Sequence, residues 1–140
     1  MPNVSDIMTT DVQVVRPHDS LRRAASLMQE LDVGALPVCD GMRLQGMLTD
    51  RDITVYGVAQ GLNADDACVA DVMSENIVYC TGEQDVGQAM RLMGDKQVRR
   101  LPVVDNDKNL VGIVSLGDLA VRQEGHIDQT VRKVSTPDGV

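Results

Sequence analysis

The sequence predicts an α+β fold of two pseudo-symmetric halves, each with the order strand, helix, strand, strand, helix, packed together through their sheets. Three observations predict it. Short segments rich in β-branched residues occur in the same order in both halves, and a segment with helical spacing follows the first of them each time. Each half also closes on a hydroxyl residue followed three positions later by Asp. Because each half alone is too small to bury a large core, the halves are expected to share one.

Each half opens with the same short motif, which reads DIMT at residues 6–9 and DVMS at residues 71–74. A run of mostly β-branched residues follows at residues 12–15 and again at 77–80, and each run predicts a strand. The offset between the two copies is the same for both segments, as expected of an internal repeat.

A helix is predicted after each of these strands. Ser20 is the expected N-cap in the first half, and Asp85 is the expected N-cap in the second. Gln88 lies three residues after Asp85, which is the spacing of a capping box. Apolar residues recur at helical spacing behind both caps and are expected to face the core, at Leu21, Ala24, Met28 and Leu31 and at Val86, Ala89, Met90 and Met93.

A hairpin is predicted next in each half. The tripeptide Leu-Pro-Val begins its first strand, and Pro37 and Pro102 are expected at the first position or at an edge, because proline cannot donate a ladder hydrogen bond. The turns are predicted at Asp40-Gly41 and at residues 105–107, and the return strands at residues 44–48 and 110–114.

A closing helix is predicted in each half, from about Asp50 to Gln60 and from about Gly117 to Glu124. The boundaries that follow are residues 4–60 for the first domain, 61–67 for a linker, 68–124 for the second domain and 125–140 for a C-terminal tail of one or two helical turns with a frayed end.

The junction between the return strand and the closing helix carries the candidate chemistry. Thr49 precedes Asp52 by three residues, and Ser115 precedes Asp118 by three. One interpretation is a helix cap, in which the oxygens accept from free backbone N–H groups. The other is a ligand site, in which the hydroxyl holds a phosphate and the carboxylate holds sugar hydroxyls. Two occurrences in matching surroundings favour the ligand interpretation.

Composition excludes several classes of protein. A net charge of −8, from 13 basic and 21 acidic residues, is unlike that of a DNA-binding protein. Two Tyr without Phe or Trp leave few stacking platforms for single-stranded nucleic acid. No apolar run reaches membrane-spanning length and no secretory signal is apparent, so we expect no membrane association and a cytoplasmic location. The three cysteines, without a C-x-x-C pair, are expected to be reduced, and those inside apolar strand-like runs to be buried.

No catalytic or metal-binding constellation is apparent, so the chain is not expected to be an enzyme. His18 and His126 have no Cys, Ser or second His at ligand or triad spacing. Residues 105–109 are rich in side-chain oxygens, but they lack the Gly and the closing Glu of a calcium loop, and a turn explains them better.

The ordered set of motifs, present twice, resembles a tandem pair of cystathionine-β-synthase (CBS) domains, or Bateman module, over about residues 4–124. The resemblance implies two β-α-β-β-α units packed through their sheets, with two clefts that take adenosine-containing ligands. By position, Thr49 and Ser115 would contact phosphate, and Asp52 and Asp118 the ribose hydroxyls. The backbone near Val14 and Tyr79 would line the adenine, and two such modules would stack as a homodimer.

The two sites are not expected to be equal. Arg99 and Arg100 precede the second Leu-Pro-Val, where the first half has Gly34 and Ala35. These arginines either neutralise phosphates or are exposed charges at a strand entry. Arg51 is either a phosphate partner or a surface ion-pair partner of Asp50 or Asp52.

The first strand of the family often carries Thr where this chain has Val14 and Tyr79. Tyr79 either stacks in or narrows its cleft, or packs in the core. Gly117 gives the second site less side-chain reach than Arg51 gives the first.

The function these expectations support is a regulatory, energy-sensing module. It would bind AMP, ADP or ATP, with S-adenosylmethionine or NAD as further possibilities, and transmit binding to a regulated protein partner. No cofactor or metal is required for this role. The alternative is a dimerisation scaffold that binds no ligand.

Overall fold

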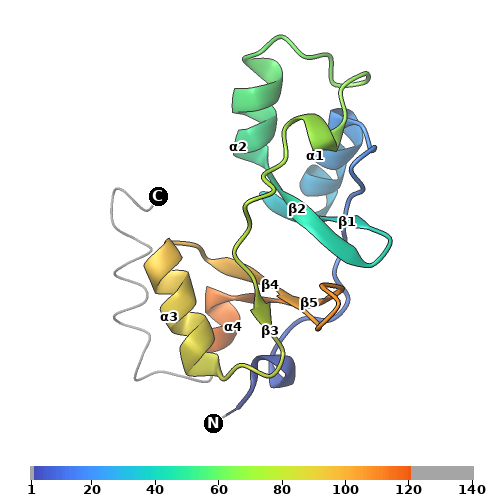
Figure 1. The fold of residues 1–140 in the computed structure, drawn as a ribbon. Coiled ribbons are helices and arrows are strands. Elements are labelled where there is room, and N and C mark those ends of the chain that lie inside the picture. The colour runs from blue at the N-terminus through green and yellow to red at the C-terminus, as the bar shows by residue number, and fades with distance from the viewer. Residues whose placement is uncertain (1, 121–140) are drawn as a thin grey trace. The chain divides into compact units, whose positions relative to one another are not determined.

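The structure is a computed structural model that describes residues 2–120. It divides into two compact units (Figure 1). Residues 13–77 form the contiguous unit, and residues 2–12 with 78–120 form the split unit, so called because two separate stretches of chain build it. Each unit contains helices packed on a small sheet, which agrees with the predicted α+β class.

The contiguous unit is organised around the antiparallel hairpin of β1 (Ala35–Asp40) and β2 (Arg43–Thr49). Single backbone bridges extend this sheet at both edges, from Val15 to Val38 and from Ser74 to Met47. The helices are α1 (Leu21–Leu31), α2 (Asp50–Asp52), the π-helix η2 (Ile53–Val58) that continues it, and the 3₁₀ helix η3 (Val69–Asp71).

The split unit repeats this plan. Strand β3 (Cys80–Thr81) runs parallel to β4 (Arg100–Val104), which pairs antiparallel with β5 (Leu110–Ser115), and Thr9 bridges to Ile113 at the far edge of β5. Its helices are the 3₁₀ helix η1 (Val4–Asp6), α3 (Val86–Lys96) and α4 (Leu116–Ala120).

The opening motif of each repeat pairs with the last strand of the other repeat. The backbone of Thr9 exchanges two hydrogen bonds of 2.9 Å with Ile113, and that of Ser74 exchanges bonds of 2.9 and 3.0 Å with Met47. The compact units therefore divide the chain after residues 12 and 77. The repeat boundaries at 4–60 and 68–124 stay a prediction about the sequence.

A glycine in each last strand makes this pairing possible. A Cβ on Gly46 would lie 2.5 Å from the carbonyl oxygen of Ser74, and a Cβ on Gly112 would lie 2.9 Å from that of Thr9. Both distances are shorter than real Cβ atoms tolerate, so glycine is required by close approach of a neighbouring backbone.

The strands predicted at residues 12–15 and 77–80 are much shorter than expected. Only Val15 pairs in the first run, and β3 starts at Cys80, the last residue of the second. The ladder bonds are Val15 N–H to the Pro37 carbonyl, 3.0 Å, and Cys39 N–H to the Val15 carbonyl, 2.9 Å. The preceding bond of this parallel ladder would need an N–H on Pro37, which proline lacks.

The expected position of the prolines was wrong. Pro37 and Pro102 are the third residues of β1 and β4, and both strands have neighbours on either side. Proline is tolerated there because its missing N–H faces the side where the parallel ladder has not yet begun. The prolines therefore prevent the parallel ladder from starting earlier, which shortens the strands predicted at residues 12–15 and 77–80.

The predicted caps and turns are confirmed. Ser20 Oγ accepts from the N–H of Arg23, and Asp85 and Gln88 form the reciprocal capping box. Gly41 takes a left-handed conformation, φ +62°, in the β1–β2 turn. The helix after Thr49 continues to Val58, close to the predicted Gln60, and α4 begins one residue before the predicted Gly117. Glu124, the tail and His126 lie outside the described residues.

The described core is aliphatic, as the scarcity of aromatic residues predicts. In the split unit, Met90, Met93 and Leu119 pack with strand residues such as Leu101 and Val114. Cys39 and Cys80 are buried, one in each unit, and burial raises the pKa of each thiol to about 11. These thiols behave as small apolar side chains, as expected.

Candidate functional site

Thr49 and Asp52 form a reciprocal capping box at the end of β2. The N–H of Asp52 donates to Thr49 Oγ1 at 3.0 Å, and the N–H of Thr49 donates to Asp52 Oδ2 at 2.9 Å. Both side chains are half-buried. The extended backbone of Thr49, φ −115° and ψ 161°, turns the strand into the helix and brings the two groups together.

Ser115 and Asp118 form the same box at the end of β5. The N–H of Asp118 donates to Ser115 Oγ at 3.1 Å, and the N–H of Ser115 donates to Asp118 Oδ2 at 3.0 Å. Each box engages only one oxygen of its carboxylate in these two bonds. The second carboxylate oxygen and the hydroxyl proton can therefore bind a ligand, so the cap and ligand interpretations are compatible.

The register of each hairpin brings the residues before Leu-Pro-Val to the box. Arg100 lies directly opposite Ser115 across β4 and β5, and Ala35 lies directly opposite Thr49 across β1 and β2. Directly opposite residues project from the same face of the sheet, with Cβ atoms typically about 5 Å apart. The structure therefore places Arg100 beside the Ser115 box, as the proposed phosphate contact requires.

In each unit, a backbone hydrogen bond also joins the residue two positions before Leu-Pro-Val to the residue that follows the hydroxyl. The N–H of Leu116 donates to the carbonyl of Arg99 at 2.8 Å, and the N–H of Asp50 donates to the carbonyl of Gly34 at 2.9 Å. The strand entry is thus tied to the residue that follows the hydroxyl in both units. Arg99 and Gly34 occupy equivalent places.

The arginine side chains near the boxes are exposed. Ion pairs within the described residues join Arg22 to Asp65 and Arg23 to Asp19, and neither pair includes Arg51, Arg99 or Arg100. The surface pairing of Arg51 with Asp50 or Asp52 is therefore not formed. Instead, Asp50 Oδ1 accepts from the backbone N–H of Arg51 at 2.8 Å.

Val14 and Tyr79 lie at equivalent places, each one residue before the start of the parallel pairing. Val14 is half-buried, whereas Tyr79 is 42% exposed. The Nζ of Lys108 lies 5.7 Å from the centroid of the Tyr79 ring, a cation–π contact. Tyr79 does not pack in the core of its unit, so that alternative is wrong. Strand β4 separates β3, which follows Tyr79, from β5, which ends in Ser115.

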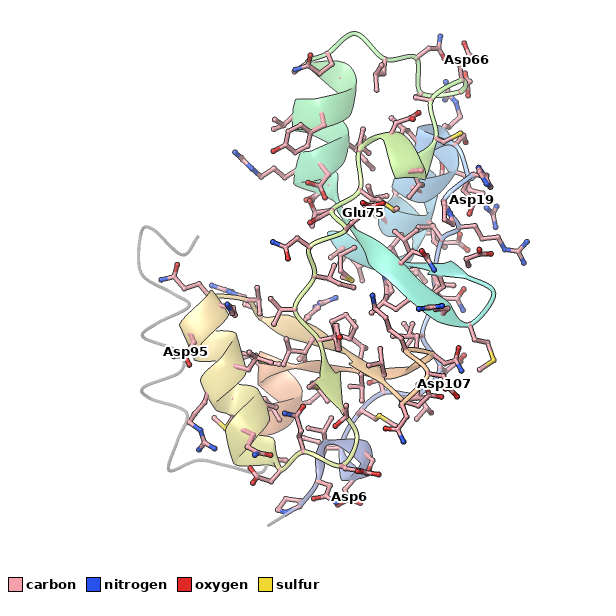
Figure 2. All side chains as sticks on the ribbon, viewed as in Figure 1. Asp6, Asp19, Asp66, Glu75, Asp95 and Asp107 are labelled. Atoms are coloured by element: carbon pink, nitrogen blue, oxygen red, sulfur yellow. The ribbon has the colours of Figure 1, made fainter. Side chains whose placement is uncertain are left out.

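Two further reciprocal boxes open the repeats and were not predicted. Asp6 accepts from the N–H of Asn3 at 2.9 Å, and Asp71 accepts from the N–H of Cys68 at 2.8 Å. Figure 2 shows Asp6 on the short helix near the N-terminus. The Asn-x-x-Asp spacing at residues 3–6 is a sequence signal that could have identified the first box.

A pocket of about 240 Å³ in the split unit was also not predicted. It lies at the end of β4 that is remote from Ser115, beside the turn that carries Asp107 (Figure 2). Hydrogen bonds from the backbone N–H groups of Asn109 and Asp107 lower the pKa of Asp105 at its rim. No local pattern could have predicted a pocket built from three separate segments. It is lined by Ser5, Met8, Thr81, Gly82, Glu83, Val104, Asp105, Asn106 and Val111.

Metal-ligand clusters and membrane-spanning helices are both absent from residues 2–120. Over residues 2–120, no three His, Cys, Asp or Glu side chains gather in a way that could hold a metal ion. None of the helices in that range is both long and apolar enough to cross a membrane.

Comparison with known proteins places these motifs in a family. The family model described as CBS domain matches residues 4–58 and 69–125. CBS domain-containing protein YhcV of Bacillus subtilis is 48% identical over 123 residues, which cover 88% of this chain and 86% of that protein. Hypoxic response protein 1 of Mycobacterium tuberculosis is 40% identical over 139 residues, which cover 98% of this chain and 96% of that protein.

Solved structures agree with this comparison. The crystal structure of Hypoxic Response Protein I with two coordinated zinc ions superposes with a TM-score of 0.78 at 41% identity, covering 86% of this chain and 98% of that one. The crystal structure of CBSX2 in complex with AMP superposes with a TM-score of 0.77 at 30% identity, covering 91% and 99%. The matched relatives, the matched structures and the doubled motifs lead to one conclusion: this chain belongs to the CBS domain family, as a tandem pair.

Proposed function

We propose that the chain is a regulatory module that binds adenine nucleotides, AMP, ADP or ATP, at the Thr49–Asp52 and Ser115–Asp118 boxes. The observation that carries the proposal is the duplicated box, in which one carboxylate oxygen and the hydroxyl proton remain available to a ligand. The AMP bound to CBSX2, a related CBS pair, supports adenosine-containing ligands as the class.

The residues of each box have distinct roles in this proposal. The free oxygen of Asp52 or Asp118 accepts from the ribose hydroxyls, and the hydroxyl of Thr49 or Ser115 donates to a phosphate oxygen. Arg100, opposite Ser115, adds a cation that can make two parallel bonds to a phosphate.

Further residues complete the proposed sites. Arg99 and Arg51 add positive charge beside the two boxes, and both are exposed. The backbone near Val14 and Tyr79 lines the adenine in this proposal. S-adenosylmethionine and NAD share the adenosine group and are the next candidates.

Binding would regulate a protein partner by favouring one of two states of the module. A ligand can do this only if it binds one state more tightly than the other. We place the chain in the cytoplasm as a homodimer in this proposal, acting on a partner that the nucleotide level controls.

A second candidate function is a dimerisation scaffold without a ligand. The two boxes favour it, because their hydroxyls and carboxylates already accept hydrogen bonds from backbone N–H groups. No buried side-chain nitrogen or oxygen of residues 2–120 lacks a hydrogen-bond partner, so nothing in that range demands a ligand for stability.

Titration calorimetry separates the two functions. The wild-type chain is titrated with AMP, ADP, ATP, S-adenosylmethionine and NAD, and the variants Asp52→Ala and Asp118→Ala with the best ligand. Asp6→Ala and Asp71→Ala are matched controls, because each removes a carboxylate that makes the same capping bond outside the proposed sites.

The proposal expects at least one ligand to bind below millimolar concentration. Each site variant should weaken one binding event by about tenfold or more, while the controls bind as the wild type does. No binding by any of the five ligands would favour the scaffold. Binding that neither Asp52→Ala nor Asp118→Ala changes would remove both boxes from the site.

A further inference from the structure

The two boxes share a backbone arrangement but differ in charge at four of five equivalent positions. The residues around Thr49 carry one positive and two negative charges, whereas those around Ser115 carry two positive and one negative. The positions are Gly34, Ala35, Asp50, Arg51 and Asp52 in the contiguous unit and Arg99, Arg100, Leu116, Gly117 and Asp118 in the split unit.

Asp50 is the residue that makes the Thr49 box negative. A Cβ placed on Gly34 would lie 3.1 Å from Asp50 Oδ2, so this carboxylate occupies the space above the strand entry. A larger residue at 34 would meet the carboxylate there. The equivalent residue in the split unit is Leu116, which has no charge, and the equivalent of Gly34 is Arg99.

Arg100 makes the Ser115 box positive. It lies directly opposite Ser115, where the contiguous unit has the methyl group of Ala35 opposite Thr49. Its side chain is exposed, and it belongs to neither ion pair of the described residues. Its charge is therefore available to an anion that approaches the hydroxyl.

We propose that the two boxes select ligands by charge, which rests on the function proposed above. The Ser115 box takes the phosphorylated nucleotide, with Arg100 as its selecting residue. The Thr49 box binds the phosphorylated nucleotide more weakly than the Ser115 box does, because the carboxylate of Asp50 repels a phosphate beside the hydroxyl. Both selecting residues act on the ligand charge, and neither is needed for the ribose contact.

The physical basis is the position of each charge relative to the shared hydroxyl and carboxylate. The hydroxyl and the carboxylate of both boxes bind ribose and one further oxygen in the same way, so they do not discriminate between ligands. A charge one residue or one strand away from the hydroxyl does discriminate, and salt screens it because it is exposed. Charge selection should thus weaken as the salt concentration rises.

Single-site backgrounds isolate the two boxes. The Asp52→Ala chain keeps the Ser115 box, and the Asp118→Ala chain keeps the Thr49 box. Calorimetry at low salt measures the affinity of each chain for AMP and for adenosine, and the ratio of the two affinities is the readout. Because both ligands carry the same base and ribose, the ratio reports only on the phosphate.

The Ser115 box should prefer AMP over adenosine by about tenfold or more, and Arg100→Ala should remove most of that preference. The Thr49 box should show little preference for AMP over adenosine, and Asp50→Asn should raise its affinity for AMP by about threefold with adenosine unchanged. Asparagine keeps the oxygen that accepts from the Arg51 N–H, so only the charge is removed.

Two charge controls exclude a general effect of net charge. Arg91→Ala removes an exposed arginine on α3, and Glu30→Gln removes an exposed carboxylate on α1. Neither should change the ratio. A ratio of AMP to adenosine affinity that is the same in both backgrounds would overturn charge selection alone. Absence of binding by both ligands in both backgrounds and in the wild type would overturn the proposed function and this proposal with it.

Discussion

The contiguous unit and the split unit share their backbone features but differ in the charged side chains around the boxes. Backbone devices recur at equivalent places in both: a glycine under the neighbouring strand, a proline that ends the parallel ladder, and a reciprocal box at the strand end. The charged side chains around the boxes do not recur, since Arg99 and Arg100 stand where the contiguous unit has Gly34 and Ala35. The fold requires the backbone features in both units, whereas the charged side chains around the boxes can differ with the ligand.

The largest effect should come from filling the glycine positions. Gly46→Ala should destabilise the chain by about 3 kcal/mol, because the new Cβ meets a backbone oxygen at 2.5 Å. Gly112→Ala should cost less, because the flexible side chain of Met8 supplies part of the contact and the backbone oxygen lies 2.9 Å away. Denaturant unfolding measures both changes.

Gly117→Ala is the control for these substitutions. Its Cβ would lie 3.6 Å from Ser115 Oγ, an ordinary contact, so its effect should stay within about 0.5 kcal/mol. If Gly46→Ala were as stable as Gly117→Ala, the close approach of the Ser74 backbone would not be a feature of the native state.

The next largest effect tests whether each opening segment packs against the other repeat. Val4 and Val69 are equivalent and fully buried, and Val4 belongs to the core of the split unit while Val69 belongs to that of the contiguous unit. Val4→Ala and Val69→Ala should each cost about 2 kcal/mol. Hydrogen exchange should show protection lost mainly in residues 78–115 for Val4→Ala and in residues 13–77 for Val69→Ala. The opposite distribution of lost protection would contradict the packing of each opening segment against the other repeat.

A smaller difference should separate the two long helices. Asp85 makes a reciprocal box with Gln88, whereas Ser20 accepts from Arg23 without a reciprocal bond. Asp85→Ala should cost about 1.5 kcal/mol and Ser20→Ala about 1 kcal/mol in thermal or denaturant unfolding. A larger loss for Ser20→Ala would show that the reciprocal bond adds nothing.

The smallest effect concerns the thiols. Cys39 and Cys80 are buried and have a pKa raised to about 11 by that burial, whereas Cys68 is half-buried. One thiol per chain should react with Ellman's reagent at pH 8, and the other two only on unfolding. Because the folded pKa is raised, the stability these thiols contribute is complete below the unfolded pKa, about 8.5, and falls as the pH rises toward 11. Equal reactivity of all three thiols would contradict this.

The fold could be predicted from the sequence where local chemistry decides the structure. The caps at Ser20 and Asp85, the turn at Gly41 and the duplicated boxes depend on residues within four positions of one another, so their patterns are visible in sequence. The short first strands could not be predicted, because Val12–Val14 fail to pair on account of a proline more than twenty residues later.

The site could be predicted only in part, for the same reason. The hydroxyl and carboxylate of each box are close in sequence, and their contact follows from helix geometry. The position of Arg100 beside Ser115 depends on the hairpin register, which the turn length sets. The negative charge that Asp50 brings to the first box depends on the strand entry lying beneath it, and the pocket depends on three distant segments.

Hydrogen exchange with and without AMP tests whether the nucleotide binds at the two boxes, because it reports which backbone N–H groups the ligand protects. AMP should slow exchange at residues 99–101 and 115–118, around Arg100 and the Ser115 box, with a weaker effect at residues 49–52. Slowed exchange at residues 81–83 and 104–106, which line the pocket at the other end of β4, with no change around Ser115, would contradict it.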